Sequence, residues 1–294
     1  MPNWQKYNES LVRRGEIVLD FDVINNWHNE LNGMNHGKEG AAYRYPDSFV
    51  QLLGYMRVYF HLPYRQTEGV VRAHSSNKVP AVPDYSTINR RVNKLEIKLN
   101  NRIGNDIVIV LDSTGIKVTN RGEWLPHKWN IRKGYLKIHV AVDIKKKKIV
   151  SLEVTSEEVH DGSKLRVLVD KAIENNHIKR VIADGAYDSN ENFRYLYNND
   201  IEAAIRVRKN SSLLSDSSRG DRAYIPRNVV VLKELENYKR WKHDVNYGCR
   251  WMAETVFSSI KRMFGEYVSA RKYPNMVKEI FLKASLYNTF ISMK

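Results

Sequence analysis

The stretch DIVIVLDSTGIKVT, residues 106–119, joins an uninterrupted apolar run to an acidic residue at its end. Runs rich in Val, Ile and Leu are typical of strands that are buried on both faces of a sheet. Asp112 follows the run directly, so a rigid strand end is expected to hold its carboxylate. RVIADGAYD, residues 180–188, repeats the pattern with Asp184. The two stretches therefore predict two buried strands that each carry a carboxylate.

The segments around these two strands predict a definite order of elements. Further strands are expected at 135–144, 149–158 and 201–209, helices at 163–176, 190–199 and 233–292, and a polar, basic loop at 210–230. The first three strands suit an antiparallel meander, and the later alternation of strand and helix suits parallel additions. This order is expected of a ribonuclease-H-like α/β fold, a mixed sheet flanked by helices. In such a sheet Asp112 would lie beside Asp184.

A helix is predicted over DVNYGCRWMAETVFSSIKRMFG, residues 244–265, and it carries a third acid. Tyr247, Arg250, Glu254 and Lys261 follow one another at spacings that place them on one stripe, at about 100° per residue. Two strand-end carboxylates and one helical carboxylate can hold hard cations through oxygen. Arg clamps phosphate through a planar fork, Lys acts as a point charge, and Tyr donates a hydrogen bond or stacks on a base. The stripe, with its basic neighbours, suits a site that binds a phosphodiester.

The N-terminal third predicts a helical region. One helical stretch is expected over 46–74, and a second helix is expected to begin at Asp84 or Ser86, either of which can cap it. A short polar turn separates the two, as in a helix-turn-helix, whose second helix enters the major groove of DNA. The alternative is an ordinary helical subdomain with a solvated basic face. The expected DNA contacts are the exposed side chains of the second helix: Ser86, Thr87, Asn89, Arg90, Arg91 and Lys94.

Charge and composition restrict the class of protein. The 294 residues include 48 Lys and Arg against 33 Asp and Glu, a net charge of +15, which favours a polyanionic partner such as nucleic acid. Cys249 is the single cysteine, so an intramolecular disulfide and a Cys-based zinc site are excluded. The N-terminus has no apolar signal region, and no apolar stretch approaches the roughly 18 residues of a membrane span. A cytoplasmic protein, associated with the nucleoid when bound to DNA, is expected.

Other acidic residues near the predicted strands are expected to be structural. Asp188 is close to Asp184, and it is predicted to cap the helix that starts near Asn190. His160 and Asp161 could form a second metal or base site. We expect them instead to cap the helix after the third strand.

Aromatic and basic side chains offer candidate contacts with DNA. Three tryptophans could stack on an unpaired or flipped base: Trp124, Trp129 and Trp241. Trp241 is favoured because it lies in the basic segment YKRWKHD, although core packing is the commoner use of Trp. Arg206, Arg208 and Lys209 follow the last predicted strand and would either line a DNA channel or form a solvated run of charge.

The stripe also supplies a family resemblance. Its pattern Y-(2)-R-(3)-E-(6)-K resembles the signature of a large group of DDE-type insertion-sequence transposases. VLDSTGIK and ADGAYDS are similar to the motifs of that group that hold its two aspartates, which places them at Asp112 and Asp184. The segments KYNESLVRRG, residues 6–15, and PDYSTINRR, residues 83–91, resemble the N-terminal region of one bacterial and archaeal subgroup. The resemblance spans nearly the whole chain.

The resemblance implies a mechanism and partners. Two Mg²⁺ ions, with Mn²⁺ as a substitute, would be held by Asp112, Asp184 and Glu254. Water would attack first and free a 3′-hydroxyl at a transposon end, and that hydroxyl would then attack the target DNA. Terminal inverted repeats would be the specific DNA, and the joining of two ends implies a homodimer in the synaptic complex. A DNA-binding region would span residues 1–104 and a catalytic domain residues 105–294.

Two alternatives share much of this sequence pattern. The first is a metal-dependent DNA nuclease that cleaves without strand transfer. The second is a non-catalytic DNA-binding protein derived from a transposase. The second is disfavoured because a pure binding module gains nothing from three clustered carboxylates beside DNA.

Overall fold

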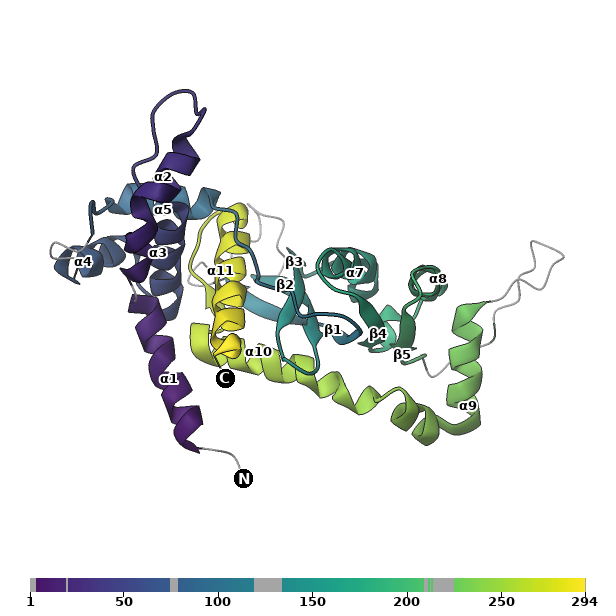
Figure 1. Cartoon of the computed structure of the whole chain (residues 1–294). Coiled ribbons are helices and arrows are strands. Elements are labelled where there is room, and N and C mark those ends of the chain that lie inside the picture. The colour runs from purple at the N-terminus through teal and green to yellow at the C-terminus, as the bar shows by residue number, and fades with distance from the viewer. Residues whose placement is uncertain are drawn as a thin grey trace. The chain divides into compact units, whose positions relative to one another are not determined.

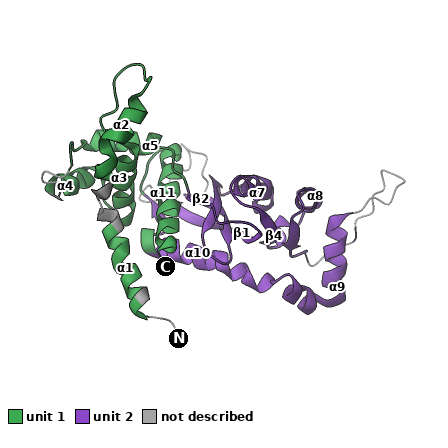
Figure 2. Cartoon of the chain, viewed as in Figure 1, with its two compact units in different colours: residues 1–98, 263–265, 269–294 green, residues 99–262, 266–268 purple. Residues whose placement is uncertain are grey.

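A computed structural model of the chain describes residues 4–19, 21–74, 79–118, 134–208, 211, 213 and 225–293 (Figure 1). The chain forms two compact units, shown in different colours in Figure 2. Unit 1 comprises residues 1–98, 263–265 and 269–294, and unit 2 comprises residues 99–262 and 266–268. Within the described residues, no helix combines the length and the apolar character needed to cross a membrane.

Unit 2 is built on a six-stranded mixed sheet with the order β3-β2-β1-β4-β5, in which β6 also pairs with β1. The strands are β1 (Ile107–Val118), β2 (Tyr135–Asp143), β3 (Ile149–Ser156), β4 (Ile178–Ala183), β5 (Glu202–Ile205) and β6 (Tyr267–Val268). Strands β1, β2 and β3 pair antiparallel, whereas β4, β5 and β6 are added parallel. The predicted meander followed by parallel additions is confirmed.

The apolar run of β1 explains its central place in the sheet. Ile109, Val110 and Leu111 are all fully buried. Because successive strand residues point to opposite faces, this run requires cover on both faces of the sheet. Helix α7 (Leu165–Ile173) packs on β2 and β3, and α8 (Asn190–Asn198) packs on β5.

The parallel register of β1 and β4 places two carboxylates side by side. Val110 of β1 is the Cα partner of Ile182 of β4. Asp112 and Asp184 each lie two residues further along their strands, so the register brings them to neighbouring positions at one end of the sheet. The prediction that these two aspartates would be neighbours rested on strand order alone, and the observed pairing agrees with it.

The helix predicted over 244–265 is interrupted. Helix α9 (Pro226–Asp244) ends first, a 3₁₀ turn η4 (Tyr247–Arg250) follows, and α10 (Trp251–Phe264) completes the segment. Asn246 causes the break because it adopts the left-handed conformation, with φ of 55°, which asparagine tolerates better than most residues. The stripe is therefore divided between a 3₁₀ turn and a regular helix.

Unit 1 is helical. Its elements are α1 (Trp4–Leu19), η1 (Phe21–Asn26), α2 (Trp27–Asn35), α3 (Asp47–Tyr59), α4 (Tyr64–His74), α5 (Tyr85–Lys94) and α11 (Tyr273–Ser292). The predicted helical stretch over 46–74 is two helices, because Pro63 disfavours a helical conformation at the residue before it and His61 has a φ of 56°. The second predicted helix is present as α5. Its cap is Asp84, whose side chain accepts hydrogen bonds from the backbone N–H groups of Ser86 and Thr87.

The C-terminal helix α11 belongs to unit 1. It packs against α3 so closely that a Cβ atom at Gly54 would lie 3.0 Å from the Leu282 side chain. Phe49 and Leu53 of α3 are fully buried, as is Phe290 of α11. The compact units thus divide the chain differently at its C-terminus from the predicted domain limits of 1–104 and 105–294, which remain predictions.

Candidate active site

Asp112 lies within β1 and is half-buried. Its Oδ1 accepts a hydrogen bond of 2.9 Å from the backbone N–H of Ser113, and its Oδ2 lies 3.5 Å from Nη1 of Arg250. Burial raises the pKa of Asp112, and the negative charges of Asp184 and Glu254 raise it further, against the lowering effects of Ser113 and Arg250. The three predicted acids are therefore near enough to act on one another electrostatically.

Asp184 follows β4 directly and begins the 3₁₀ turn η3 (Gly185–Tyr187). Its Oδ1 accepts a hydrogen bond of 2.9 Å from the backbone N–H of Ala186, which fixes the direction of the carboxylate. The turn that contains Gly162 packs very closely against the turn after Asp184. A Cβ atom at Gly162 would lie 2.6 Å from the carbonyl oxygen of Ala186, so glycine is what allows the two turns to approach.

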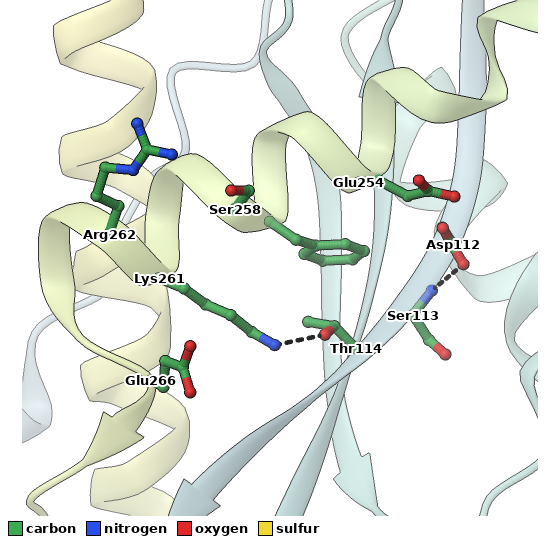
Figure 3. A pocket seen from close by; sticks show the side chains of 9 residues that line it. Asp112, Ser113, Thr114, Glu254, Ser258, Lys261, Arg262 and Glu266 are labelled. Atoms are coloured by element: carbon green, nitrogen blue, oxygen red, sulfur yellow. Dashed lines mark hydrogen bonds between the residues drawn. The ribbon is translucent and has the colours of Figure 1, made fainter.

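Glu254 projects from the first turn of α10 towards Asp112 (Figure 3). One guanidinium bridges the two acids, because Nη2 of Arg250 lies 3.0 Å from Oε1 of Glu254 while Nη1 of the same residue faces Asp112. Lys261, two turns further along α10, donates a hydrogen bond of 2.9 Å to Oγ1 of Thr114 on β1. The sheet and α10 thus present acidic and basic side chains to the same space.

That space is a cavity of about 500 Å³ within unit 2. Its lining residues are Asp112, Ser113, Thr114, Glu254, Phe257, Ser258, Lys261, Arg262 and Glu266 (Figure 3). Asp184 is not part of this lining, although it neighbours Asp112 across the sheet. Three of the four stripe residues therefore act around the cavity, two by lining it and Arg250 by bridging its acids.

The donor chemistry of the three acids fits a divalent cation of the Mg²⁺ type, which prefers carboxylate oxygen. Burial is the main cause of the raised pKa of Asp112, and the charges of Asp184 and Glu254 add to it, so a cation at this place would stabilise the charged carboxylate. Among the described residues, however, no group of three or more His, Cys, Asp or Glu side chains is already arranged to hold a metal ion. Arg250 supplies the compensating positive charge instead, and it would have to turn aside for a metal to be bound by Asp112 and Glu254.

The aromatic members of the predicted DNA-binding set are packed inside unit 2. Trp241 is 3% exposed, and its ring centroid lies 5.9 Å from that of Tyr238 and 5.2 Å from that of Tyr247. Tyr247 is itself buried, and burial raises its pKa to about 12. Stacking of Trp241 on a base remains a prediction, and it requires the indole to leave this cluster. Trp124 and Trp129 lie outside the described residues.

The side chains of α5 that are predicted to contact DNA differ in their exposure and in their contacts within unit 1. Ser86, Arg90 and Lys94 are exposed, and Thr87 is partly exposed. Arg91 is engaged within unit 1, where its Nη2 lies 2.7 Å from Oδ1 of Asp47 and its guanidinium lies over the ring of Tyr43. This arrangement makes Arg91 a residue that holds α5 in place.

Asp161 has a role that the sequence analysis missed. His160 lies at the N-cap position of the 3₁₀ turn that precedes α7, but its side chain makes no capping hydrogen bond, and the prediction that Asp161 is a cap is wrong. Oδ1 of Asp161 instead lies 3.0 Å from Nζ of Lys137 and 3.3 Å from Nδ1 of His139. Burial alone would raise the pKa of Asp161, but hydrogen bonds from His139, Lys137 and Ser113 hold it well below its usual range.

This ionic cluster lies next to the first catalytic candidate. His139 of β2 is the Cα partner of Ser113, the residue after Asp112. Lys137 and His139 are two residues apart on one strand, so they share a face of the sheet. That spacing is the signal that could have located the cluster, but the register that brings Asp161 to it is not visible in the sequence.

Asp188 also differs from its prediction. Ser189 caps α8, and Asp188 is almost fully buried against Arg227 of α9, with 2.6 Å between Oδ1 and Nε. Asp188 therefore joins α9 to the segment that follows Asp184.

Asp188→Ala is expected to destabilise unit 2 by about 3–5 kcal/mol, because it leaves the charge of the buried Arg227 guanidinium without its carboxylate. Urea denaturation of the variant beside wild type measures this loss. Glu236→Ala is the control, because Glu236 is exposed on α9, and it should change stability by less than about 0.5 kcal/mol. Equal losses for the two variants would show that the Asp188 pair does not stabilise the unit.

A mixed sheet that presents neighbouring carboxylates, facing a helix with a third carboxylate and basic neighbours, is typical of enzymes that transfer phosphoryl groups with divalent cations. Residues 103–289 match the family described as "Transposase DDE domain", and residues 12–121 match a second family model with the same description. The chain belongs to the DDE transposases. This family consists of enzymes that cleave and transfer DNA strands, generally with Mg²⁺. The predicted DDE-type transposase is confirmed at this level.

Solved structures show weaker similarity. A piggyBac transposase synaptic complex with hairpin DNA has 10% identity and a TM-score of 0.41, over 95% of this chain and 74% of that chain. A Drosophila P element transposase strand transfer complex has 12% identity and a TM-score of 0.32, over 90% of this chain and 69% of that chain. A simian T-cell lymphotropic virus intasome has 11% identity and a TM-score of 0.28, over 68% of this chain and 65% of that chain. With TM-scores below 0.5, these similarities carry no conclusion about this chain.

Proposed function

We propose that the chain is the transposase of an insertion sequence and that Asp112, Asp184 and Glu254 are its catalytic acids. The observation that carries the proposal is the bridge made by Arg250, which brings Asp112 of the sheet and Glu254 of α10 to one cavity although they lie far apart in the sequence. The register of β1 and β4 adds Asp184 at the neighbouring position. The strand order supports assignment of unit 2 to the ribonuclease-H-like folds.

The acids would hold two Mg²⁺ ions, which on binding activate the attacking oxygen and stabilise the leaving oxygen of an in-line displacement. Water is the nucleophile for cleavage, and the freed 3′-hydroxyl is the nucleophile for strand transfer. Arg250 is the residue that changes partners, because its fork can pass from the carboxylates to a DNA phosphate. Lys261 adds a point charge at the other end of the cavity, where Thr114 orients it. Tyr247 lies in the same 3₁₀ turn as Arg250, and its ring packs against Trp241 at 5.2 Å.

DNA recognition belongs to unit 1 in this proposal. The exposed side chains of α5, namely Ser86, Arg90 and Lys94 together with Thr87, would contact the terminal inverted repeats, and Arg91 would keep the helix in position. A homodimer would join two transposon ends in the synaptic complex. Work on chromosomal DNA would place the enzyme in the cytoplasm, at the nucleoid.

A strand-transfer assay tests this function. The purified chain is incubated with Mg²⁺, a duplex that carries one end of the element and a second, labelled duplex. Joined product in the wild-type reaction, and its absence for Glu254→Gln, is the expected result. Cleavage without joining would favour a nuclease, and activity that is unchanged by Glu254→Gln would refute the catalytic assignment.

The pH dependence of metal binding follows from the raised pKa of Asp112. A metal ion must displace the proton of that carboxyl group, so the rise in Tm caused by Mg²⁺ should be full above its pKa and should vanish below it. Without metal, the stability of the folded protein changes with pH in the opposite direction. A carboxyl whose folded pKa is raised by burial is protonated more readily in the folded state, so the metal-free protein gains stability from this group as the pH falls through that pKa. Thermal unfolding with and without Mg²⁺ across acidic and neutral pH measures both effects, and an unchanged Mg²⁺ response in Asp112→Asn would contradict the assignment.

A further inference from the structure

Unit 1 contains a second cavity, of about 490 Å³. It is formed by the turn between α3 and α4, one face of α5, and the segment that leads into α11. Its lining residues are Arg57, His61, Leu62, Pro63, Tyr64, Asn89, Asn93, Ser269, Ala270, Arg271, Lys272 and Asn275. The volume lies within the range of pockets that bind small molecules, and the catalytic mechanism uses none of these residues.

The lining of this unit 1 cavity is basic and contains no carboxylate. Arg271 and Lys272 are exposed, and within the described part of the chain no ion pair or hydrogen bond is found for either side chain. Glu279 contacts the lining residues Arg57 and Ser269, but its carboxylate is buried and is already paired with Arg57 and Lys283. The positive charge at the mouth of the cavity is therefore not neutralised by the protein.

Arg57 adds a buried donor that lacks a partner. The residue is 8% exposed, and its Nη2 donates to Ser269 and to Glu279. Its Nε is buried, and no hydrogen-bond partner is found for it in the part of the chain that the structure describes. A buried N–H without an acceptor costs free energy, which a ligand oxygen in the cavity would recover.

Two helices begin at this cavity. Helix α4 starts at Tyr64 and α11 starts at Tyr273, and the residues just before each start, Pro63 and Lys272, line the cavity. The first turn of a helix carries a partial positive charge and usually has backbone N–H groups without intrahelical partners. In α11, however, Pro274 has no N–H and the N–H of Asn275 donates to the carbonyl oxygen of Lys272 at 2.9 Å, so this helix contributes its partial charge alone. These features add to the basic side chains in favouring an anion such as phosphate.

The part of the unit 1 cavity formed by α5 is neutral, in contrast to its basic mouth. Its amide side chains can form hydrogen bonds with the edge of a base. Asn93 donates through Nδ2 to the carbonyl oxygen of Asn89 at 2.7 Å and to its Oδ1 at 2.6 Å. The Nδ2 of Asn89 and the Oδ1 of Asn93 remain, and no partner is found for either atom among the described residues. A donor beside an acceptor is the pattern that amide side chains use to pair with a base. The ring of Tyr64 forms an adjoining wall, held on one side by Arg57 at 4.6 Å.

We propose that the unit 1 cavity binds a nucleotide, with its phosphate at Arg271 and Lys272 and its base against Asn89 and Asn93. The nucleotide would be either a free nucleoside monophosphate or an unpaired nucleotide of a DNA strand, since both present the same chemistry. Only the second source rests on the proposed function. The basic mouth, the unpaired Arg57 donor and the amide pair carry the proposal together.

The experiment measures the affinity of the full-length chain for two probes: deoxyadenosine monophosphate and a fluorescent single-stranded oligonucleotide. The double variant Arg271→Ala/Lys272→Ala removes two charges at the cavity. Its control, Arg44→Ala/Lys98→Ala, removes the same two residue types from exposed positions of unit 1 outside the cavity. The cavity variant should bind either source roughly tenfold or more weakly, because it loses charged hydrogen bonds, and the control should match wild type.

Salt dependence gives a second readout for the oligonucleotide. Removal of two phosphate contacts should lower the slope of log affinity against log salt by roughly 1.4, and the control pair should leave the slope unchanged. Asn89→Asp tests the base side, because it replaces the free donor by a charged acceptor and should weaken both probes. Asn29→Asp is its matched control, at an exposed helical position of unit 1.

The binding results distinguish a free nucleotide from a DNA strand as the ligand of the cavity. Binding of both probes that depends on Arg271 and Lys272 assigns the cavity to free nucleotides and strands alike, and binding of the oligonucleotide alone assigns it to a strand. Equal effects of the cavity pair and the control pair, or no binding of either probe, would overturn the proposal. If the wild-type chain binds nucleotide but gives no strand transfer, the proposed function is refuted, whereas the nucleotide site in unit 1 is still supported.

Discussion

Asp112→Asn is expected to abolish DNA cleavage and strand transfer, by a factor on the order of 1,000 or more. Asparagine keeps the shape of the side chain but removes the charge that would hold the proposed cations, and metal ions supply several kcal/mol of transition-state stabilisation. Burial already raises the pKa of Asp112, so the loss of its charge should leave the folded protein as stable as wild type or slightly more stable. Cleavage of an end-bearing duplex with Mg²⁺, beside thermal denaturation of the same samples, measures both expectations.

Asp200→Asn is the matched control for this prediction, because Asp200 is exposed at the turn between α8 and β5. It should cleave DNA at the wild-type rate. A cleavage rate for Asp112→Asn within a few-fold of this control would show that Asp112 is not a metal ligand. A large loss of stability in Asp112→Asn would instead show that its main role is structural.

Glu279→Ala is expected to destabilise unit 1 by about 3–5 kcal/mol. Glu279 of α11 is buried with two cations, at 3.2 Å from Arg57 and 3.5 Å from Lys283, and removal of the acid takes away the carboxylate that both buried charges share. The same carboxylate accepts hydrogen bonds from the backbone N–H groups of Ser269 and Ala270, so the segment that enters α11 would also lose its anchor. Urea denaturation that is followed by helical circular dichroism measures the loss.

The pH dependence gives this prediction a second test. Burial alone would raise the pKa of Glu279, but Arg57 and Lys283 hold it below its usual value. A carboxyl with a lowered folded pKa stabilises the protein above its unfolded pKa, and this contribution is lost as the pH falls through the folded value. Glu96→Ala is the control, because Glu96 is exposed in unit 1. Similar stability and pH profiles for the two variants would contradict the role assigned to Glu279.

Most of the sheet could be predicted from the sequence because it depends on local patterns. The apolar runs before Asp112 and Asp184 are long enough to require burial on both faces, and the alternation of strand and helix then restricts the order of the strands. The start of α5 is also local, since Asp84 caps a helix whose first residues follow it directly. Local periodicity also predicted a helix that contains Glu254 and Lys261, which is present as α10, whereas Tyr247 and Arg250 lie in a 3₁₀ turn before it.

The parts that were missed depend on single conformations or on distant partners. The left-handed Asn246 divides the stripe, and propensity does not distinguish such a residue from one inside a helix. Asp161 and Asp188 were predicted to be caps, but their partners, Lys137 and Arg227, are far away in the sequence. The position of α11 in unit 1 follows from buried packing against α3, to which no local signal points.

The central claim is that Asp112, Asp184 and Glu254 share metal ions. Anomalous diffraction from crystals of the protein grown with Mn²⁺ tests it most directly, because the manganese positions are seen without any assumption about activity. We predict manganese peaks in contact with the carboxylates of Asp112 and Asp184, with Glu254 turned towards them and Arg250 displaced from its bridge. Manganese elsewhere on the protein, with the Arg250 bridge between Asp112 and Glu254 intact, would contradict the account.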